Sequence, residues 1–498
     1  MNVNPITRLD YPDPDVIRVE DTYYMVSTTM HFMPGCEILQ SFDLVHWEHV
    51  TYVYETLDHT DAQQLKSGQN IYGQGMWAAS LRYHEGRFYI CFVANDTRKT
   101  YLYTSEKIDG PWKKQLIEGF YHDASLLFDE DGRNYIVYGN DEIWITELNE
   151  DLTAPKKDGL HRLLVSDHKN PKLGYEGSHI QKINGYYYIF LVHSLRDRWM
   201  RTEACFYSDS LEGEFTGGDV LCDDRGYCGQ GVAQGGIVDT PDGKWYAMLF
   251  QDSGAVGRIP ILLPVTWKDH FPVFGQNGHV PEEIEVHSTR PGYIYQPLVG
   301  SDDFCNGLLP RWQFNHDPDP RYYHLDALQG TYTITTREVC TELTQAVNTL
   351  TQRMSYPSCA AEVTVDASAL KEGDVAGLCA LQGCYAAVGI TKHHGKYEVL
   401  MLDKKEDGIL DMTEGTVVES HQMDFRLEAD FCNMKDEARC YYRVNKGDWL
   451  PIGTVHKLYF KLDHFTGCRF GLFCYAAEET GGSACFRDFK YYDVDEIS

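Results

Sequence analysis

The chain has 498 residues, of which 43% are hydrophobic and 24% charged, which predicts two globular domains and excludes a disordered or fibrous protein. Its formal net charge of −30 opposes binding to nucleic acids and to anionic membrane surfaces. No apolar run approaches the ~20 residues that a membrane-spanning helix needs. We therefore expect neither a nucleic-acid partner nor a membrane partner.

Cysteine usage and the N-terminal sequence both favour a reducing compartment. The fifteen cysteines are odd in number and show neither Cys-x-x-Cys pairs nor the Cys/His spacing of zinc sites. Several stand in strand-like runs, where a free thiol acts as a small hydrophobe. Residues 1–15 lack the basic and apolar regions of a secretory signal. These features predict a cytoplasmic protein.

Five similar segments recur along the first half of the chain. Each has a short apolar run, a polar turn and an aromatic-rich strand, and four of the five turns contain Glu-Gly, Asp-Gly or Asn-Gly, which favour tight β-hairpins. The segments are residues 16–26, 81–90, 127–137, 180–190 and 237–247. Their spacing of roughly 45 to 65 residues leaves room for four strands per repeat and indicates propeller blades. We therefore predict a five-bladed β-propeller over residues 1–285.

A chemically distinctive residue precedes each hairpin at nearly the same offset. These residues are Asp13, Trp77, Asp123, Glu176 and Gln234. The innermost strand of every blade faces the central channel of a propeller, so equivalent positions in different blades converge there. Taken singly, Asp13 and Asp123 are well explained as turn-capping residues. Their shared register with the other positions favours a common site.

Three carboxyl groups at one end of a narrow channel have a predictable chemistry. They repel one another, so we expect at least one to have a raised pKa and to keep its proton near neutral pH. A protonated and an ionised carboxyl that face each other across a pocket are what cleavage of a glycosidic bond requires. In such a pocket Trp77 would offer a stacking face to a sugar ring, and Gln234 would offer a neutral hydrogen-bonding floor.

The pattern changes after residues 286–300, which we interpret as a linker. Beyond the linker, apolar and polar residues alternate in short runs that are separated by polar turns. The runs are residues 331–335, 361–365, 397–401, 425–429, 458–462 and 470–474. Alternation with a period of two predicts a two-sheet β-sandwich of the jelly-roll type over residues 301–498. The whole chain is therefore predicted to be all-β.

Two acidic positions near the ends of this second domain are candidate metal ligands. Hard cations take clustered oxygen ligands, so Asp303, which follows Asp302, and Asp488 are candidates for binding calcium. Exposed acids on so acidic a chain explain the same residues without a metal ion.

The motifs around the carboxyl groups resemble those of glycoside hydrolase family 43, the β-xylosidases and α-L-arabinofuranosidases. The opening Tyr-Pro-Asp-Pro-Asp resembles the motif of the general base, here Asp13, and His-Asp-Ala-Ser-Leu-Leu resembles that of the auxiliary aspartate, here Asp123. Tyr-Glu-Gly-Ser-His resembles the motif of the general acid, here Glu176. Gly-Met-Trp-Ala-Ala-Ser-Leu-Arg resembles the second-blade motif, which contains Trp77, and a Gly-Arg pair resembles the motif whose arginine, here Arg258, contacts the sugar.

The resemblance extends to the second domain, with two departures in the first. Residues 312–319 and 348–353 resemble signatures of a concanavalin-like C-terminal domain that is found on one branch of the family. Gln234 stands where many members carry a histidine that often sits beside a central calcium ion. Phe32 stands where related xylosidases carry a tryptophan. The resemblance thus implies that Phe32 and Gln234 bind substrate, and it leaves a structural calcium ion and the preferred terminal sugar open.

The resemblance implies an exo-acting, inverting glycosidase that releases terminal α-L-arabinofuranosyl or β-D-xylosyl residues from plant cell-wall oligosaccharides of xylan or arabinan. Glu176 would protonate the departing oxygen, Asp13 would activate a water molecule on the opposite face of the sugar, and Asp123 would raise the pKa of Glu176 and orient it. No cofactor would be needed for this chemistry. An endo-arabinanase and a non-catalytic carbohydrate-binding protein are the alternatives, and a homo-oligomer is left open. The presence of all three carboxyl groups favours an enzyme.

Overall fold

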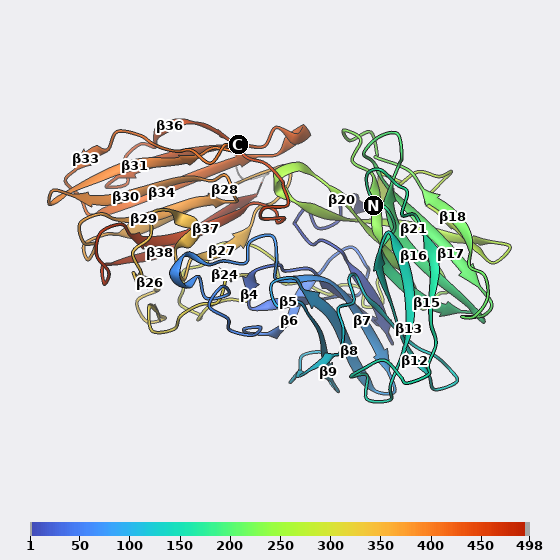
Figure 1. Cartoon of the computed structure of the whole chain (residues 1–498). Coiled ribbons are helices and arrows are strands. Elements are labelled where there is room, and N and C mark those ends of the chain that lie inside the picture. Colours follow the sequence, from blue (N-terminus) through green and yellow to red (C-terminus); the bar gives the residue numbers. More distant parts are fainter. Residues whose placement is uncertain (1, 494–498) are drawn as a thin grey trace.

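A computed structural model describes residues 2–493, and its regular structure is almost entirely β-sheet (Figure 1). Two β-domains lie side by side, with the C-terminal half (orange and red) on the left of the view and the N-terminal half on the right. The helices within residues 2–493 are 3₁₀ turns of three residues each, and none is long and apolar enough to cross a lipid bilayer. The prediction of an all-β chain is confirmed.

Five four-stranded antiparallel sheets form a β-propeller in the first domain. Their strands are β2 (Asp15–Val19), β3 (Thr22–Ser27), β5 (Gly35–Ser41) and β6 (Glu48–Tyr54); β7 (Met76–His84), β8 (Arg87–Ala94), β9 (Lys99–Ser105) and β10 (Lys113–Ile117); β11 (Ser125–Phe128), β12 (Asn134–Asn140), β13 (Glu142–Leu148) and β14 (His161–Ser166); β15 (Glu176–Ile183), β16 (Tyr186–Ser194), β17 (Arg201–Ser208) and β18 (Thr216–Leu221); and β19 (Val232–Asp239), β20 (Trp245–Asp252), β21 (Arg258–Lys268) and β22 (Phe271–Phe274). The first two strands of each blade are one of the five predicted hairpins. The five-bladed propeller is therefore confirmed. Two short strands, β1 (Asn2–Val3) and β23 (Glu283–Ile284), pair with each other and join the ends of this domain.

Two antiparallel sheets form a β-sandwich in the second domain. One has the order β32-β31-β30-β29-β37-β27-β24-β4, with β33 beside β31, and the other has the order β25-β26-β38-β28-β34-β35-β36. Their strands are β4 (Phe32–Met33), β24 (Gln313–Asn315), β25 (Tyr323–Asp326), β26 (Thr331–Thr335), β27 (Leu350–Arg353), β28 (Ser358–Asp366), β29 (Asp374–Leu381), β30 (Ala386–His393), β31 (Lys396–Lys404), β32 (Leu410–Met412), β33 (Thr416–Val418), β34 (Gln422–Asp430), β35 (Glu437–Val444), β36 (Leu450–Lys457), β37 (Arg469–Ala476) and β38 (Ser483–Asp493). Side chains of both sheets, among them Phe314, Phe425 and Phe470, fill one core.

Five of the six strands expected in this domain are present, as β26, β28, β31, β34 and β37. The sixth expectation, residues 458–462, is wrong, because this segment follows β36 as a loop. Its backbone does not pair with a strand, and the side chains of Phe460 and Leu462 line a cavity beside the propeller. Residues 286–300 contain no strand. They run along the first blade, where Thr289 donates a backbone hydrogen bond to Phe42.

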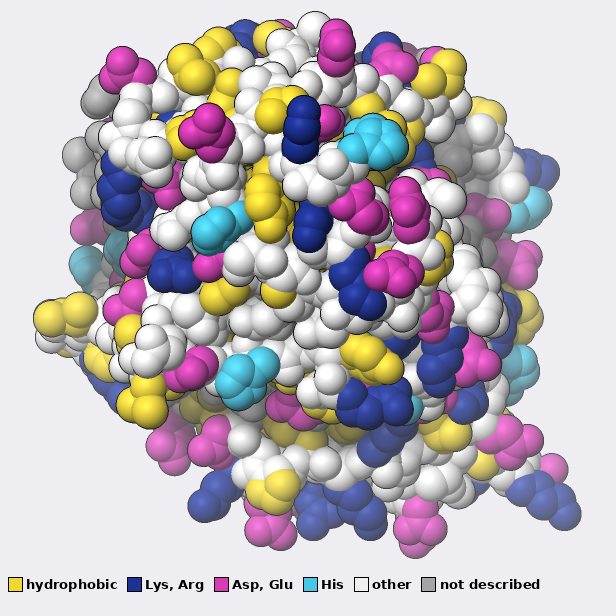
Figure 2. All heavy atoms as spheres, turned by 90° about the vertical axis from the view of Figure 1, so that its left-hand side faces the viewer, with side chains coloured by type: hydrophobic (Ala, Val, Ile, Leu, Met, Phe, Trp, Pro, Cys, Tyr) yellow, Lys and Arg dark blue, Asp and Glu magenta, His cyan; other side chains and the backbone are white. Residues whose placement is uncertain are grey.

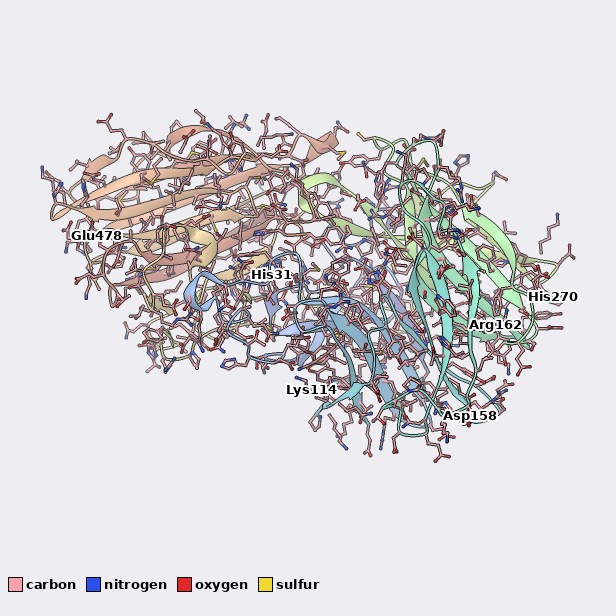
Figure 3. The ribbon with its side chains drawn as sticks, in the orientation of Figure 1. His31, Lys114, Asp158, Arg162, His270 and Glu478 are labelled. Carbon is pink, nitrogen blue, oxygen red and sulfur yellow. The ribbon has the colours of Figure 1, made fainter. Side chains whose placement is uncertain are left out.

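One strand of the sandwich comes from the propeller. The loop between β3 and β5 contains β4, which pairs with β24 at the edge of the larger sandwich sheet. His31, immediately before β4, lies at the junction of the two domains (Figure 3) and is fully buried. The two domains therefore share main-chain hydrogen bonds as well as side-chain contacts.

The surface mixes charges of both signs in spite of the net charge. Figure 2 shows the end of the molecule that lies on the left in Figure 1, where acidic and basic side chains alternate over short distances. All fifteen cysteines fall within the described part of the chain and are free thiols, and nine of them are buried.

Local backbone irregularities turn the predicted site residues toward the channel. The pairing register shifts at the start of β7, β15 and β19, beside Trp77, Glu176 and Gln234. The extra residue of such a bulge leaves the ladder and re-aims its neighbours. Asp13, Asp123 and Gln234 also adopt left-handed backbone conformations, with φ of 52°, 46° and 65°. These conformations are costly for residues with a side chain and persist where the surrounding structure imposes them.

Candidate active site

The starts of the innermost strands meet at one end of the propeller channel and form a narrow pocket. Its lining residues are Asp13, Thr28, Met30, Trp77, Asp123, Glu176, Arg201, Gln234, Arg258 and Phe465. The pocket thus brings together all five equivalent positions of the blades and Arg258. It combines three carboxyl groups, two guanidinium groups and two aromatic rings, which is a composition suited to a polar ring-shaped ligand.

Asp13 is held in place by two hydrogen-bond donors. Its Oδ1 accepts a hydrogen bond from Arg258 Nη1 at 3.0 Å, and its Oδ2 accepts one from Thr28 Oγ1 at 2.6 Å. Asp13 and Arg258 are both almost fully buried, so solvent ions screen this pair little. The arrangement fixes the carboxyl group of Asp13 at the pocket and pairs it with a cation, which suits a general base.

Asp123, Glu176 and His122 form a second charged group in the pocket. His122 Nε2 lies 3.6 Å from Asp123 Oδ2 and 3.5 Å from Glu176 Oε2. Asp123 also accepts a hydrogen bond from the backbone of Gly177 at 3.1 Å, and Glu176 accepts one from Asn140 Nδ2 at 2.9 Å. Both carboxyl groups thus lie next to the imidazole of His122, and each also accepts a hydrogen bond from a donor of its own.

Burial and close charges shift the protonation of this group. Burial raises the pKa of Asp123 to about 6, with Glu176 and Asp13 adding to the rise and His122 opposing it. Burial lowers the pKa of His122, but Asp123 and Glu176 outweigh burial and raise it to about 9. The raised carboxyl pKa that the sequence led us to expect therefore appears at Asp123. His122 is a cation at neutral pH.

A buried glutamate, Glu203, holds the backbone of Gln234 in place. The backbone of Gln234 donates a 2.7 Å hydrogen bond to Glu203 Oε2, and burial raises the pKa of Glu203 well above its usual value. The side chain of Gln234 packs against Gly177, where an added Cβ would lie 2.7 Å from it. Gly177 has a φ of +67°, so both backbone conformation and space require glycine next to Glu176.

The loop after β36 brings one residue of the sandwich into the pocket. Phe465 lies with its ring 4.2 Å from the guanidinium of Arg258 and 5.7 Å from the ring of Trp77. His464, the preceding residue, stacks on Tyr72 of the propeller with ring centroids 3.9 Å apart. The propeller pocket is thus completed by the second domain.

A larger cavity of about 590 Å³ opens beside the pocket. It shares Trp77, Glu176, Arg201 and Phe465 with the pocket, and its other lining residues include Trp199 and three residues of the loop after β36. Its volume falls within the range of small-ligand sites. The cavity therefore continues the pocket outward between the two domains.

Sequence reasoning missed several residues of this site. His122 directly precedes Asp123 in the same motif, so its position carried a usable signal. Arg201, whose guanidinium pairs with Asp252, begins the third strand of a blade, whereas the prediction considered only innermost strands. Phe465 carried no signal, because it lies in the other domain.

Phe32 is not part of the pocket, although the resemblance placed it there. Because β4 pairs with β24, Phe32 turns into the sandwich. It is buried there against Leu343 and Tyr475, and Arg469 lies 3.4 Å above its ring. Met30, two residues earlier, reaches the pocket instead.

Potential metal ligands occur at two places. Among residues 2–493, one set of three potential ligands lies with all its ligand atoms within 4.8 Å of one another, namely His122, Asp123 and Glu176. Asp303 and Asp488 in the sandwich are both exposed, and Asp303 accepts a 2.9 Å hydrogen bond from the backbone of Cys305. Calcium binding by Asp303 and Asp488 stays a prediction.

Comparisons with known proteins match both domains. Residues 3–272 match the model of glycosyl hydrolases family 43, and residues 301–492 match that of the β-xylosidase C-terminal concanavalin A-like domain. A β-xylosidase of Formosa agariphila is 27% identical, with 99% of this chain and 89% of the relative covered. A non-reducing end α-L-arabinofuranosidase of Bacteroides ovatus is 26% identical over 66% of this chain and 63% of its own.

A solved structure extends this likeness to three dimensions. A bifunctional GH43-CE protein of Bacteroides eggerthii is 42% identical and superposes with a TM-score of 0.93 over all of this chain. The chain spans 64% of the length of that protein.

Proposed function

The chain belongs to family 43 of the glycosyl hydrolases, and from this premise we propose that it is an exo-acting, inverting glycosidase that releases terminal α-L-arabinofuranosyl or β-D-xylosyl units from plant cell-wall oligosaccharides. The observation that carries the proposal is the convergence of Asp13, Asp123 and Glu176 in one pocket. The relatives' names supply both sugars, because one is a β-xylosidase and another an α-L-arabinofuranosidase.

Glu176 acts as the general acid in this proposal. It lies at the boundary between the pocket and the larger cavity and lines both, which suits a group that protonates the oxygen between the terminal sugar and the leaving group. Asp123 faces Glu176 across His122. Repulsion between the two carboxylates favours retention of a proton on the pair, which a general acid needs.

Asp13 acts as the general base. Its ion pair with Arg258 and its hydrogen bond to Thr28 orient the carboxyl group so that it can accept a proton from a water molecule. Asp13 precedes the first blade, and Glu176 begins the fourth. A base and an acid on different blades leave room for that water between the base and the sugar, as single-step inversion requires. Arg258 and Trp77 would fix the sugar ring.

Exo action is supported by the closed side of the pocket. Phe465 and the loop that carries it cover one flank of the propeller opening, whereas an endo-arabinanase needs a groove that is open at both ends. The terminal sugar would enter the narrow pocket, and the leaving group would occupy the cavity of about 590 Å³. Free thiols throughout the described chain support a cytoplasmic role in finishing short oligosaccharides.

A panel of nitrophenyl glycosides tests the activity. We expect hydrolysis of the α-L-arabinofuranoside, the β-D-xyloside or both. Asp13→Asn, which removes the base with little change of shape, should lower turnover by about 10²- to 10⁴-fold. A folded Asp13→Asn protein that keeps more than about a tenth of wild-type turnover would contradict the role of Asp13.

Product stereochemistry tests the arrangement of the two carboxyl groups. Inversion predicts that proton NMR of a freshly mixed α-L-arabinofuranoside reaction shows the β-anomer of arabinose before mutarotation. Initial release of the α-anomer would indicate a covalent intermediate and carboxyl groups only about 5–5.5 Å apart, and it would overturn the proposed mechanism.

A further inference from the structure

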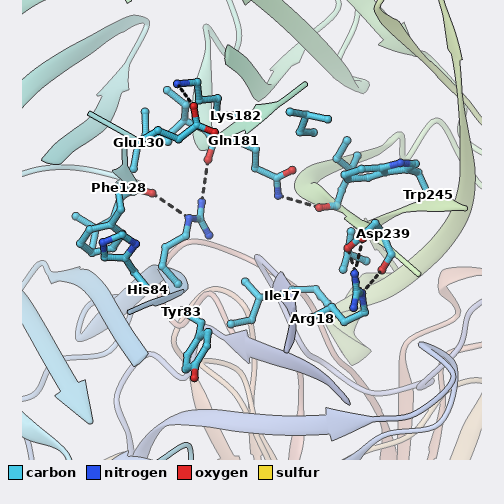
Figure 4. Close-up of a pocket in the computed structure, with 18 residues that line it drawn as sticks. Ile17, Arg18, Tyr83, His84, Phe128, Glu130, Gln181, Lys182, Asp239 and Trp245 are labelled. Carbon is cyan, nitrogen blue, oxygen red and sulfur yellow. Dashed lines mark hydrogen bonds and ion pairs between the residues drawn. The ribbon is translucent and has the colours of Figure 1, made fainter. Parts of the chain in front are cut away.

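The opposite end of the propeller channel has its own charged centre. The same innermost strands that begin at the candidate active site end at a pocket of about 460 Å³, shown in Figure 4, which all five blades line. Hydrogen bonds cross between blades around this pocket, for example from Gln181 to the carbonyl of Ile237. At its inner side lies Arg82, on the innermost strand of the second blade.

Every donor of the Arg82 guanidinium meets an oxygen atom. A guanidinium carries five N–H donors. Nε donates to the carbonyl of Leu126 at 2.9 Å. Nη1 donates to Asp15 Oδ2 at 2.8 Å and to the carbonyl of Leu81 at 2.6 Å. Nη2 donates to Ser125 Oγ at 2.6 Å and to the carbonyl of Ile180 at 3.2 Å.

These five oxygen atoms come from four different blades. Asp15 is on β2, Leu81 on β7, Ser125 and Leu126 on β11, and Ile180 on β15. One carboxylate, one hydroxyl and three carbonyls form the kind of oxygen shell that a hard cation such as calcium recruits. Here the cation at the centre of the shell is a side chain of the protein.

Both oxygen atoms of Asp15 already have hydrogen-bond partners within the protein. It is fully buried; its Oδ1 meets His179 Nδ1 at 3.0 Å, and its Oδ2 accepts from Arg82 and from the backbone of Leu81. Burial raises the pKa of Asp15, but Arg82 and His179 outweigh burial and lower it below its usual value. The carboxylate is therefore ionised and already compensated.

The position at which many family members carry a calcium-associated histidine also differs. Gln234 occupies it here, packed against Gly177 and bonded to Glu203. An amide offers a divalent cation a single neutral oxygen. Gln234 therefore supplies one neutral ligand atom at most, and the oxygen shell at the other end of the channel is already filled by Arg82.

We propose that the guanidinium of Arg82 takes the place of a metal ion on the axis of this propeller, ties four blades together and makes the stability of the domain independent of a divalent ion at that position. The inference concerns the scaffold and does not depend on which sugar the enzyme releases.

Removal of the guanidinium tests the proposal. Arg82→Met leaves Asp15 buried without its main counter-charge, so we expect the Tm to fall by about 10 °C. Arg82→Lys keeps the positive charge but has fewer N–H donors, so its Tm should fall less than that of Arg82→Met. The matched control is Arg18→Met, in the same pocket. Arg18 pairs with Asp239, and both side chains are partly exposed, so we expect a loss below about 2 °C. Equal, small losses for Arg82→Met and Arg18→Met would overturn the proposal.

A double-mutant cycle tests the pairing itself and tolerates a weakly folded single variant. Asp15→Asn combined with Arg82→Met removes both charges, so the double variant should be no less stable than Arg82→Met alone. Strictly additive losses would show that the two side chains do not act as a pair and would contradict the proposal.

Chelation of the wild-type protein needs no variant. We expect EDTA, followed by calcium addition, to change the Tm by less than about 1 °C. The same titration on a variant with Asp303→Asn and Asp488→Asn separates an axial ion from one bound in the sandwich. A fall in Tm on chelation that persists in this variant would overturn the proposal. If the protein hydrolysed none of the glycosides, the proposed function would fail, but the Tm measurements would still test the role of Arg82.

Discussion

His122 holds a positive charge between two of the three carboxyl groups in the pocket. Its pKa of about 9 keeps it protonated at neutral pH, next to an Asp123 whose pKa of about 6 lies close to the same range. A nearby cation lowers the proton affinity of a carboxyl group. His122 therefore opposes the repulsion between Asp123 and Glu176 and lowers the pKa that burial raises at Asp123.

Replacing His122 with phenylalanine or glutamine removes this opposition. The pKa of Asp123 then rises and its repulsion of Glu176 is unopposed, so the alkaline limb of the kcat/KM profile should move to higher pH by about one unit. Profiles of wild type and variants on one glycoside measure the shift. His161→Gln alters an imidazole that stacks on Trp144 at the surface and should leave the limb in place. An alkaline limb that stays at the same pH or moves to lower pH in the His122 variants would contradict this role of His122.

Glu176→Gln tests proton donation directly. Glutamine keeps the hydrogen bond from Asn140 within reach but cannot supply a proton, so the loss should be about 10²- to 10⁴-fold for leaving groups that need protonation. Nitrophenolate departs without a proton, so the rate of the variant on nitrophenyl glycosides should fall far less. Rates across a series of leaving groups of increasing pKa give the comparison. Equal losses throughout the series would assign Glu176 another role.

The candidate site was predictable at the residue scale because it follows a repeat. Asp13, Trp77, Asp123, Glu176 and Gln234 occupy one position per blade, and a propeller brings such positions together whatever the details of packing. The protonation pattern was harder to predict, because the rise at Asp123 depends on its burial and on the imidazole beside it, and neither can be read from the spacing of motifs.

At the scale of elements, the loop of residues 458–468 decides how the pocket closes. Gly467 donates its backbone N–H to Asp10 at 2.8 Å, and the backbone of Cys468 donates to Ala255 at 2.8 Å. Gly73 of the propeller approaches the loop so closely that an added Cβ would lie 2.4 Å from the carbonyl oxygen of Leu462. These contacts hold Phe465 against Arg258.

Gly73→Ala should therefore move the loop and impair catalysis. Its matched control is Gly68→Ala, because both glycines have a positive φ, of 69° and 76°, and only Gly68 has open space around the added Cβ. Each substitution costs about 1–2 kcal/mol in backbone strain. Displacement of Phe465 should lower kcat/KM by about 10- to 100-fold in Gly73→Ala alone. Equal kcat/KM values for the two folded variants would show that the loop does not shape the pocket.

The same loop shows why one strand was predicted wrongly. Leu-Tyr-Phe-Lys-Leu, residues 458–462, alternates like the five runs that do form strands, and the pattern cannot reveal what its apolar residues face. Phe460 and Leu462 face a cavity next to the other domain. Turn-flanked hairpins such as 81–90 were predictable because their pairing partner is adjacent in sequence.

For the molecule as a whole, the junction between the domains depends on neutral histidines. His31 lies with its ring centroid 4.8 Å from that of His316 and 5.8 Å from that of His464. Burial lowers the pKa of all three, to about 4 for His464. The charged neighbours of His464 are Asp463, which opposes the shift, and Lys404, which adds to it, while Arg469 adds to the shift at His31.

This junction should make the protein sensitive to acid. Unfolded histidines bind protons below a pH of about 6.5, whereas the buried ones remain neutral down to their lowered pKa values. The unfolded state thus binds more protons in that interval, and stability falls as pH decreases through it. His464→Phe keeps an aromatic stack on Tyr72 and removes one of these groups. It should shrink the difference in Tm between about pH 7 and about pH 5.

An exposed histidine provides the control. His421→Phe alters a side chain that is about half exposed, at 52%, and should leave the Tm difference of the wild type unchanged. If His464→Phe behaves like His421→Phe, acid sensitivity must come from other groups.

The crossing of β4 into the sandwich has a practical consequence for anyone who subclones the domains. A gene cut within residues 286–300 would leave β24 without its neighbour, and Phe32 and Met33 without a sheet. Unpaired strand edges and uncovered apolar side chains recruit other chains. Each half expressed alone should thus go to inclusion bodies or form soluble aggregates, and co-expression of both halves should recover soluble material. Truncation is therefore a poor way to ask what the second domain does, and point variants of the shared loop are the better tool.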